Sequence, residues 1–300
     1  MKVLITGATG LVGSEIVNVC HVKGIDVHYL TTSKHKISNK PNYKGFYWNP
    51  SVYEIDIACF EGVDAVVNLA GASISKRWTK SYKQEVLDSR LQSLELLYDS
   101  VSKNGIKIKQ FISASAIGIY PDSDINYYEE DYKEYSFTFL GKVVTHWEKA
   151  VDAFKELNFN VAKIRIGLVL SAKGGALTEI IKPMKFGLGA AFGDGKQWQS
   201  WIHVKDLAEL FVHCIEQNLS GIYNGVAPNP VSNNELTKAA AKALGKPLFL
   251  PNIPKAIMAL TLGEMHILLF ESQRVSAQKI ESTGFDFQFP NLQLALEDIL

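Results

Sequence analysis

Cysteine is scarce in this chain, and its few residues are spread far apart. The 300 residues include three cysteines, Cys20, Cys59 and Cys214. An odd number at such wide spacing does not fit the disulfide framework of a secreted scaffold, and it fits reduced, buried thiols better. The seven histidines likewise lack a paired spacing such as HExxH, so we expect no metal site.

Long apolar runs and an excess of charge of one sign are also missing. No run approaches the roughly 18–20 apolar residues that a membrane-spanning helix needs. The 31 basic residues (Lys plus Arg) equal the 31 acidic ones, so the formal net charge is zero. These absences argue against a membrane or a nucleic acid as a partner. The strand-like Val3–Ile5 stands where a secretory signal would have a longer apolar stretch, so we expect a cytoplasmic protein.

The sequence does contain a regular alternation of short apolar runs with helix-length amphipathic stretches over residues 1–170. Asp64–Leu69 is a β-branched run typical of a buried parallel strand, and Lys80–Lys103 has the length and pattern of a helix. We therefore predict an α/β fold, a Rossmann-type doubly wound parallel sheet with helices on both faces.

Beyond residue 170 the sequence becomes richer in glycine and proline, with helical patterns such as Asn233–Leu244 and Lys255–Leu269. We predict a dinucleotide-binding domain over residues 1–170 and a smaller C-terminal α-rich substrate lobe over residues 171–300. Residues 200–227 are the exception, because a helix and a strand there are expected to return to the main sheet.

A Gly-x-x-Gly-x-x-Gly motif opens the chain, formed by Gly7, Gly10 and Gly13 directly after the predicted strand Lys2–Thr6. Binding of a dinucleotide requires a tight turn at the first glycine, close backbone approach to a pyrophosphate at the second, and close helix–sheet packing at the third. The N-terminus of the following helix offers free N–H groups and partial positive charge to phosphates. The motif predicts a dinucleotide site.

The end of the second predicted strand distinguishes NAD from NADP. Thr31–Lys36 reads Thr-Thr-Ser-Lys-His-Lys and contains no acid. An acid there would bind the ribose hydroxyls and repel a 2′-phosphate, whereas hydroxyls and lysines suit a phosphate. We therefore predict NADP(H) as the cofactor. The alternative is a solvated basic loop that contacts no ligand.

Several further motifs resemble one family. The glycine-rich opening, Asn68–Gly71 and Ser113–Tyr120 resemble the extended branch of the short-chain dehydrogenase/reductase superfamily. Other segments resemble its atypical epimerase family, also labelled nucleoside-diphosphate-sugar epimerase or cell-division inhibitor: Arg77–Thr79, Lys83–Glu85, Asp88–Arg90, Gly187–Gly189, Ser200–His203, Asn224–Pro230 and Gln273–Val275. The resemblance covers essentially the full length of the chain.

The resemblance implies that NADP(H) lies across the carboxyl edge of the sheet. Together with the glycine motif it predicts cofactor contacts from Gly7, Thr9, Gly10, Leu11, Val12, Gly13, Thr31, Thr32, Ser33, Lys34, Leu69, Ala70, Gly71, Glu85, Arg90, Ser113 and Arg165. The chain departs from the family at Thr32, where related members often carry Arg. Arg grips a 2′-phosphate with a planar fork, whereas Thr offers one hydroxyl, so Lys34 or Lys36 would have to compensate.

The two arginines among these residues, Arg90 and Arg165, differ in the kind of partner that each one needs. Arg90 lies five residues beyond Glu85 on the helix after Asn68–Gly71, so the two side chains either flank one ligand from adjacent turns or are ordinary surface charges. Arg165 ends a buried-looking strand, where an unpaired charge would be costly. It therefore needs an anion, a carboxylate or solvent at the end of that strand.

The superfamily normally works with Ser, Tyr and Lys, where the Tyr hydroxyl transfers a proton and the Lys lowers its pKa. Ser115 occupies the serine position here. The helix predicted over residues 139–157 presents Leu140 at the Tyr position and Val144 at the Lys position, and a shift of one residue does not restore the pair. The usual proton donor is therefore missing.

Loss of a positioned general acid costs about 10²–10⁴-fold in rate. Another residue donates the proton, or the reaction needs none, or catalysis has been lost. We take Ser115 and Tyr120 as the catalytic candidates, although Tyr120 has the alternative of packing under the C-terminal lobe. The predicted substrate pocket has basic and aromatic residues, namely Arg77, Trp78, Lys142, Trp201 and His203.

The leading hypothesis is an NADP(H)-dependent oxidoreductase or epimerase-like enzyme that acts on an unknown small molecule. The alternative is a non-catalytic NADP(H)-binding regulator, which the absent Tyr and Lys favour. Sugar-nucleotide epimerisation ranks below both, because no base is evident for the oxidation of a sugar hydroxyl. The sequence leaves open whether the chain forms a homodimer.

Overall fold

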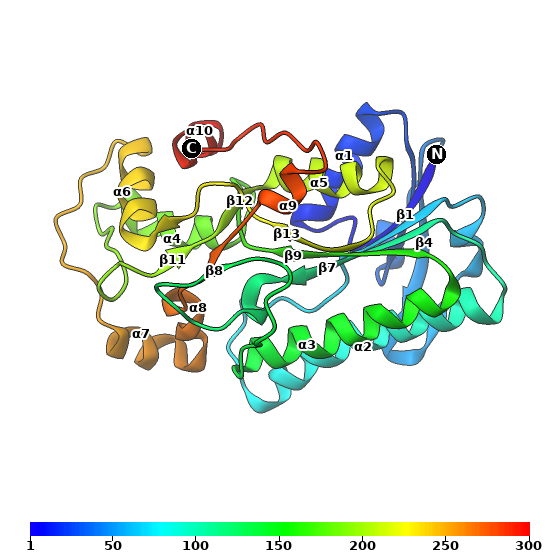
Figure 1. Cartoon of the computed structure of the whole chain (residues 1–300), viewed down its shortest axis with the longest axis horizontal. Coiled ribbons are helices and arrows are strands. Elements are labelled where there is room, and N and C mark those ends of the chain that lie inside the picture. Colours follow the sequence, from blue (N-terminus) through cyan, green and yellow to red (C-terminus); the bar gives the residue numbers. More distant parts are fainter.

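The computed structural model describes residues 1–300 and is built around one large sheet (Figure 1). Its strands run in the order β13-β9-β7-β6-β1-β2-β4-β3, with β5 paired to β4. Neighbours from β13 to β4 are parallel, whereas β3 and β5 run antiparallel to β4. The strands are β1 Lys2–Thr6, β2 Asp26–Thr31, β3 Asn39–Lys40, β4 Tyr43–Asn49, β5 Glu54–Ile55, β6 Ala65–Asn68, β7 Gln110–Ala116, β9 Asn160–Ile166 and β13 Gly221–Gly225.

Helices cover both faces of this sheet. On one face α1 (Leu11–Val22) packs against α5 (Val204–Glu216), and on the other α2 (Lys80–Lys103) packs against α3 (Phe139–Asp152) (Figure 1). The α/β fold with a doubly wound parallel sheet, predicted from the sequence, is confirmed.

Local signals fix the long helix α2. The Thr79 side chain accepts a hydrogen bond from the backbone N–H of Tyr82 at 3.1 Å and so caps the first turn. At the other end Gly105 adopts a φ of +59°, a left-handed conformation that glycine tolerates and that stops the helix. The predicted helix Lys80–Lys103 is confirmed in both bounds.

Two helices differ from their predicted extent. The helix predicted over residues 139–157 ends at Asp152 and continues as a 3₁₀ turn through Leu157. The continuous helix predicted over Lys255–Leu269 is wrong. It is broken into α7 (Lys255–Leu262), a 3₁₀ turn and α8 (Ile267–Phe270), because Gly263 takes a φ of +59° that a helix cannot continue through.

The C-terminal part adds a smaller core beside the end of the sheet (Figure 1). Leu170, Trp201 and Leu236 lie in that core with residues of α4 (Ala176–Lys185), α6 (Asn233–Ala243) and α10 (Leu292–Ile299). The remaining elements are short: β10 Leu168–Leu170 pairs with β12 Trp201–His203, β11 Trp198–Gln199 with β14 Val231–Ser232, and β8 Tyr127–Tyr128 with β15 Arg274–Val275, followed by α9 Gln278–Glu281.

Residues 204–225 belong to the main sheet layer, since α5 packs on α1 and β13 pairs with β9. The division of the chain at residue 170 stays a prediction. In the structure β10, which ends at Leu170, already pairs with β12, so the two parts share strands at this point.

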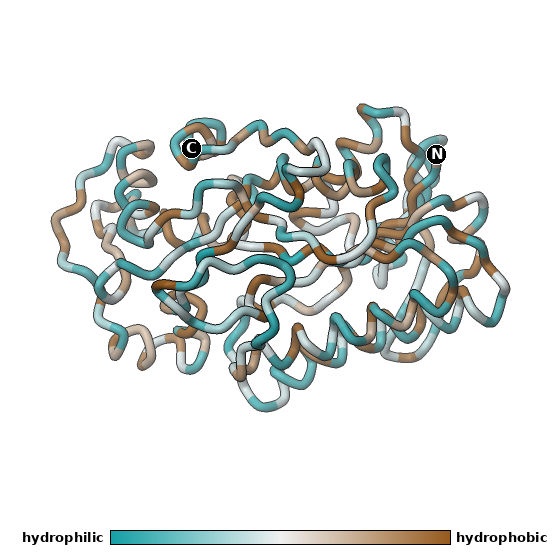
Figure 2. Tube along the Cα trace, in the orientation of Figure 1, coloured by the Kyte–Doolittle hydropathy of each residue, from teal (hydrophilic) through white to brown (hydrophobic).

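Apolar residues gather along the central strands (Figure 2). The cysteines Cys20, Cys59 and Cys214 are free and buried. Burial raises the pKa of Cys20 and Cys214 to about 12, so these thiols stay protonated at neutral pH and are poor nucleophiles. No helix combines the length and the apolar character needed to cross a membrane.

Candidate functional site

The glycine motif forms a tight turn between β1 and α1. Gly7 has a φ of +70°, and a Cβ built on Gly13 would lie 2.2 Å from the carbonyl oxygen of Gly7. Only glycine at position 13 therefore lets the helix approach the turn this closely. Gly10 begins α1 with no side-chain cap, and Thr9, Leu11 and Val12 lie beside it at this end. The first N–H groups of α1 thus have no side-chain cap, and the anion site predicted there stays a prediction.

A ladder of polar side chains ties three strand ends together at this edge. The Thr6 hydroxyl donates to Asn68 Oδ1 at 2.8 Å and accepts from the backbone N–H groups of Leu69 and Ala70 at 2.9 and 3.0 Å. Asn68 Nδ2 donates in turn to the Ser113 hydroxyl at 3.3 Å. Ser113 is fully buried within this ladder, so it positions the site instead of facing a ligand.

An open cleft of about 530 Å³ lies beside the turn after β6. Four of the predicted cofactor contacts line it, Thr32, Ala70, Gly71 and Glu85. Serines and amide side chains of α2 complete much of its wall, which makes the cleft polar. We call this space the open cleft.

The loop after β2 carries the predicted specificity residues. Thr31 is buried and its hydroxyl accepts from the Ser33 N–H at 3.2 Å, which shapes the turn. Thr32 is exposed toward the open cleft. The Lys34 ammonium lies 4.8 Å from the centre of the Tyr47 ring and is solvent-exposed, so it is free to reach a phosphate.

A second, more enclosed cavity of about 210 Å³ lies between the sheet edge and the C-terminal part, and we call it the inner pocket. Its wall is largely apolar. Leu140 and Val144 of α3 both line it, so the positions that would carry Tyr and Lys in the superfamily face this cavity. Trp198, Ser200 and Gln273 line it as well, and their side chains donate hydrogen bonds to the backbone carbonyls of Asp124, Gln273 and Tyr120.

Arg90 of α2 joins the two cavities. It lines the inner pocket, and its guanidinium carbon would lie 3.0 Å from a Cβ placed on Gly71 in the open cleft. The guanidinium stacks on Trp147 at 4.9 Å and donates to the Val86 carbonyl at 2.7 Å, but its buried Nε has no partner. Burial lowers the pKa of Arg90 to about 10, and no carboxylate offsets the cost of burying the charge.

Arg165 is paired with a carboxylate of the protein, which is one of the partners that its position on a buried strand predicted. It is only 1% exposed, and Glu148 of α3 accepts from its Nε at 2.8 Å and its Nη2 at 3.0 Å. Its Nη1 donates to the Tyr120 hydroxyl at 2.9 Å. The predicted cofactor contact is therefore corrected: the carboxylate that Arg165 requires is supplied by the protein, and all three nitrogens are occupied.

The two catalytic candidates belong to the same buried network. The Ser115 hydroxyl donates to Glu148 Oε1 at 2.6 Å, and the Tyr120 hydroxyl donates to Asn224 Oδ1 at 2.8 Å. Neither side chain is more than 3% exposed, and neither lines the inner pocket. Both hydroxyls are engaged in hydrogen bonds outside the inner pocket, so the geometry does not favour the predicted roles of Ser115 and Tyr120 in proton transfer, which stay predictions.

Electrostatics agree with a structural role for this network. Burial alone would lower the pKa of Arg165, but the hydrogen bonds and charge of Glu148 outweigh it and raise that pKa. For Glu148, burial alone would raise the pKa. The hydrogen bonds and positive charge of Arg165 outweigh burial, so the pKa of the Glu148 carboxyl is lowered. Burial raises the pKa of Tyr120 to about 12. The ion pair stays charged and the phenol stays neutral across the physiological range.

The predicted substrate residues do not gather in the inner pocket. Arg77 and Lys142 are exposed, and Trp78 is buried against Tyr82 with its indole N–H donating to the Ile74 carbonyl at 2.9 Å. Trp201 is fully buried in the C-terminal core. A basic or aromatic residue type does not reveal whether a side chain faces a cavity or a core, and these placements are corrected accordingly.

His203 is a structural cap. It is 1% exposed, and its Nδ1 accepts from the Lys205 N–H at 3.1 Å at the start of α5. Its ring packs on Phe289 at 4.0 Å. Burial lowers the pKa of His203 to about 4 against the opposing charge of Asp298, so the ring is neutral at physiological pH.

The sequence reasoning missed Glu271 as a site residue. It lines the inner pocket directly after α8, beside Gln273, which had been noted only as part of a family motif. The sequence signal is faint: one acid closes the apolar run Ile267–Phe270. Nothing in that pattern distinguishes a pocket residue from a solvated helix end.

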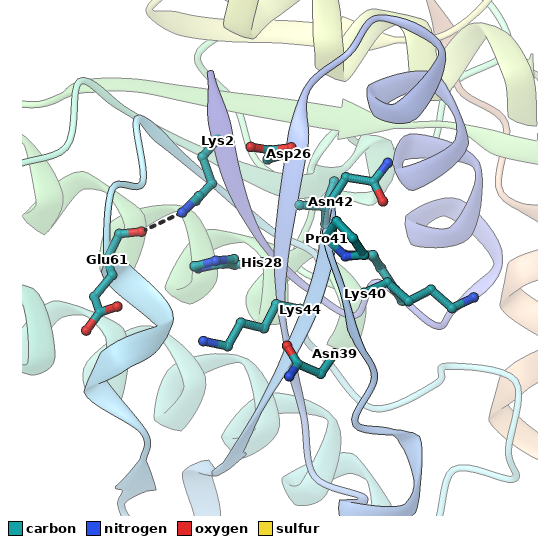
Figure 3. Close-up of a pocket in the computed structure, with 11 residues that line it drawn as sticks. Lys2, Asp26, His28, Asn39, Lys40, Pro41, Asn42, Lys44 and Glu61 are labelled. Carbon is teal, nitrogen blue, oxygen red and sulfur yellow. Dashed lines mark hydrogen bonds between the residues drawn. The ribbon is translucent and has the colours of Figure 1, made fainter.

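A third cavity, of about 420 Å³, lies at the opposite edge of the sheet (Figure 3). Lys2, Asp26 and Lys44 line it at the amino ends of β1, β2 and β4, and Lys2 Nζ donates to the Glu61 carbonyl at 3.0 Å. Ligands of doubly wound sheets bind at the carboxyl ends, so this cavity is not the candidate site. No group of three or more His, Cys, Asp or Glu residues is arranged to hold a metal ion.

Comparison with known proteins agrees with this geometry. The NAD dependent epimerase/dehydratase family matches residues 3–225, and a domain of unknown function, DUF1731, matches residues 253–299. An epimerase family protein of Staphylococcus aureus (strain MRSA252) is 38% identical over 299 residues, which is 99% of this chain and 98% of that protein.

Solved structures extend the comparison. The human epimerase family protein SDR39U1 (isoform 2), solved with NADPH, is 30% identical with a TM-score of 0.86, covering 100% of this chain and 99% of that one. A nucleoside-diphosphate sugar epimerase from Corynebacterium glutamicum is 29% identical with a TM-score of 0.78, covering 99% of this chain and 57% of that one. By sequence and by fold, this chain belongs to the NAD dependent epimerase/dehydratase family.

Proposed function

We propose that this chain binds NADP(H) across the open cleft and the inner pocket, and that it is an oxidoreductase or epimerase-like enzyme for a small carbonyl or alcohol compound. The observation that carries the proposal is the position of Arg90. A buried guanidinium with an unpartnered Nε lies between the two cavities and beneath Gly71, where a bound ligand would supply the missing partner.

The residues present fit a nicotinamide dinucleotide. The uncapped start of α1 would hold the pyrophosphate, and Thr32 and Glu85 would face the adenosine half in the open cleft. When bound, the nicotinamide supplies or accepts a hydride. The relative solved with NADPH supports NADP(H) over NAD(H), and the exposed Lys34 offers a positive charge to a 2′-phosphate.

The inner pocket favours a small substrate. Its volume of about 210 Å³ is below the range typical of sites for drug-sized ligands, about 300–1,000 Å³, and its wall is largely apolar. A compact carbonyl compound with apolar substituents suits this space better than a sugar nucleotide does.

Calorimetric titration with NADPH and NADH tests the cofactor half of the proposal. We expect Gly13→Ala to abolish NADPH binding, because its Cβ would collide with the Gly7 carbonyl. Gly105→Ala is the control. Gly105 has a positive φ, so alanine there should cost about 1 kcal/mol of stability, but the residue lies beyond the end of α2 and outside the site. We expect Thr32→Arg to raise the preference for NADPH over NADH about tenfold through a planar contact with the 2′-phosphate. Wild-type protein that binds neither nucleotide would rule out the proposal.

One observation favours a second candidate, a non-catalytic NADP(H)-binding regulator. Leu140 and Val144 line the pocket where the superfamily has Tyr and Lys, and Ser115 is committed to Glu148. A screen of small carbonyl compounds with NADPH separates the two candidates. Reduction of any compound by the wild type eliminates the regulator.

A further inference from the structure

The segment Glu271–Gln273 is held rigidly against the inner pocket. The Ser272 N–H donates to Asp122 Oδ1 at 2.7 Å, and Gln273 Nε2 donates to the Tyr120 carbonyl at 2.8 Å. The Ser200 hydroxyl donates to the Gln273 carbonyl at 2.8 Å. These bonds connect the segment to both parts of the molecule, so the side chain of Glu271 is presented at a fixed place in the pocket wall.

The Glu271 carboxyl is incompletely satisfied. Its Oε1 is buried and has no hydrogen-bond partner, and no cation forms an ion pair with it. The pocket that it lines is otherwise largely apolar. An unpartnered buried carboxyl oxygen is costly, so the inner pocket is lined by a carboxyl group whose hydrogen bonds the protein does not complete.

The surroundings bring the pKa of this carboxyl close to neutral pH. Burial, with a smaller contribution from the charge of Asp122, raises the pKa of Glu271 to about 7. The Thr138 hydroxyl and the Lys255 ammonium oppose the rise. Arg90 is the other charged group of the pocket wall. A pKa near the working pH is the property that general acid–base catalysis requires.

Other candidates for proton transfer are occupied or lie elsewhere. The hydroxyls of Ser115 and Tyr120 are bound within the buried network, and Glu148 is held as a carboxylate by Arg165. Lys142 is exposed outside the pocket. Among the residues that line the inner pocket, Glu271 is the one carboxyl group.

We propose that Glu271 replaces the missing tyrosine as the proton donor and acceptor of the inner pocket, an inference that rests on the proposed function. In the reductive direction the carbonyl carbon of the substrate gains a hydride from the reduced nicotinamide, and its oxygen takes the proton of Glu271. The products are an alcohol, the oxidised nicotinamide and the Glu271 carboxylate, which regains a proton from solvent. In the reverse direction the carboxylate accepts the proton of an alcohol.

The first test needs no cofactor. Carboxyl absorption in infrared difference spectra, recorded against pH for the wild type and Glu271→Gln, isolates the titration of this group. We expect a carboxylic acid band that disappears with a midpoint near pH 7 and is absent from Glu271→Gln. Glu281→Gln, an exposed acid on α9, is the matched control and should retain the band. Titration at the ordinary glutamate value of 4.5 would overturn the inference.

The second test is kinetic, with NADPH and a panel of small aliphatic and aromatic aldehydes and ketones. We expect Glu271→Gln to lower kcat by about 10²–10⁴-fold while the Kd for NADPH stays unchanged, and Glu281→Gln to behave as wild type. The wild-type rate of reduction should fall as pH rises through about 7, because the acid form is the donor.

The outcomes separate the two proposals. If the wild type reduces a compound and Glu271→Gln reduces it at the same rate with the same pH profile, the role of Glu271 is refuted and the proposed function stands. If the wild type binds NADPH and reduces nothing in the panel, the enzyme proposal fails and the role of Glu271 fails with it.

Discussion

Two sets of ionisable side chains lie near the carboxyl edge of the sheet. In one, the completed set, the protein supplies a hydrogen-bond partner for each buried polar atom. In the other, the incomplete set, it leaves a buried polar atom without a partner. Arg165 and Glu148 satisfy each other and draw in Ser115 and Tyr120. Arg90 and Glu271 each retain a buried polar atom without a partner, and both line the inner pocket. Burial alone is therefore a poor guide to function. The completed set joins α3 to β9 within the fold, and both residues of the incomplete set line the inner pocket.

Breaking the completed set should have the largest effect on stability. Glu148→Ala leaves the guanidinium of Arg165 buried without an anion, and we expect the free energy of unfolding to fall by about 3–5 kcal/mol. Urea denaturation of the variant beside Glu156→Ala, an exposed acid in the turn after α3, measures the difference. Equal stability of the two variants would contradict the structural role of the network.

Arg90→Met should produce the opposite pattern. Methionine retains much of the packing on Trp147 and removes a charge that has no carboxylate partner, so we expect the free energy of unfolding to change by less than about 1 kcal/mol. The Kd for NADPH should rise about tenfold or more, because a charged contact to the nucleotide is lost. Calorimetry and urea denaturation on the same preparation check both values. A variant as unstable as Glu148→Ala with unchanged affinity would erase the distinction between the two sets.

A smaller effect on the free energy of unfolding is expected from His203, a buried ionisable residue of the C-terminal part. Its folded-state pKa of about 4 lies below the ordinary value of 6.5, so the unfolded chain binds more protons between these pH values. Stability should therefore fall as pH drops from 6.5 toward 4, by up to about 1 kcal/mol per pH unit from this residue.

His203→Asn keeps a capping oxygen for α5 and removes the titration. We expect its stability to depend less steeply on pH over that range than that of the wild type. His35→Asn, which changes an exposed histidine, should leave the slope unaltered. Parallel slopes for all three proteins would show that the buried ring of His203 does not titrate as expected.

Strands, turns and helix ends that depend on neighbouring residues in the sequence could be predicted. The strand Lys2–Thr6, the glycine turn and the helix Lys80–Lys103 each carry their own signals of periodicity, φ requirement or capping. The need of Arg165 for an anion also followed from the burial of its strand. Its partner Glu148 did not, because the pair forms only when α3 packs beside β9.

The pocket itself depends on contacts between distant segments, which single-residue chemistry does not encode. Tyr120 and His203 are residue types common in active sites, yet neighbours from far along the chain bury both of them. Glu271 lacks any motif, and its environment arises only when residues 271–273 bond to Asp122, Tyr120 and Ser200. For this reason four predicted cofactor contacts line the open cleft, whereas neither predicted catalytic residue lines the inner pocket.

The wall of the inner pocket is assembled from two regions of the chain that separate family models match. Glu271 and Gln273 come from the segment matched by the separate domain of unknown function, whereas the glycine turn and Arg90 come from the segment matched by the epimerase/dehydratase family. The proposed reactive group and the proposed nucleotide-binding groups thus lie on stretches of chain that two separate family models match. We expect a chimera that takes residues 253–299 from a relative to change the proton-transfer group of the inner pocket and to keep the affinity of this chain for NADP(H).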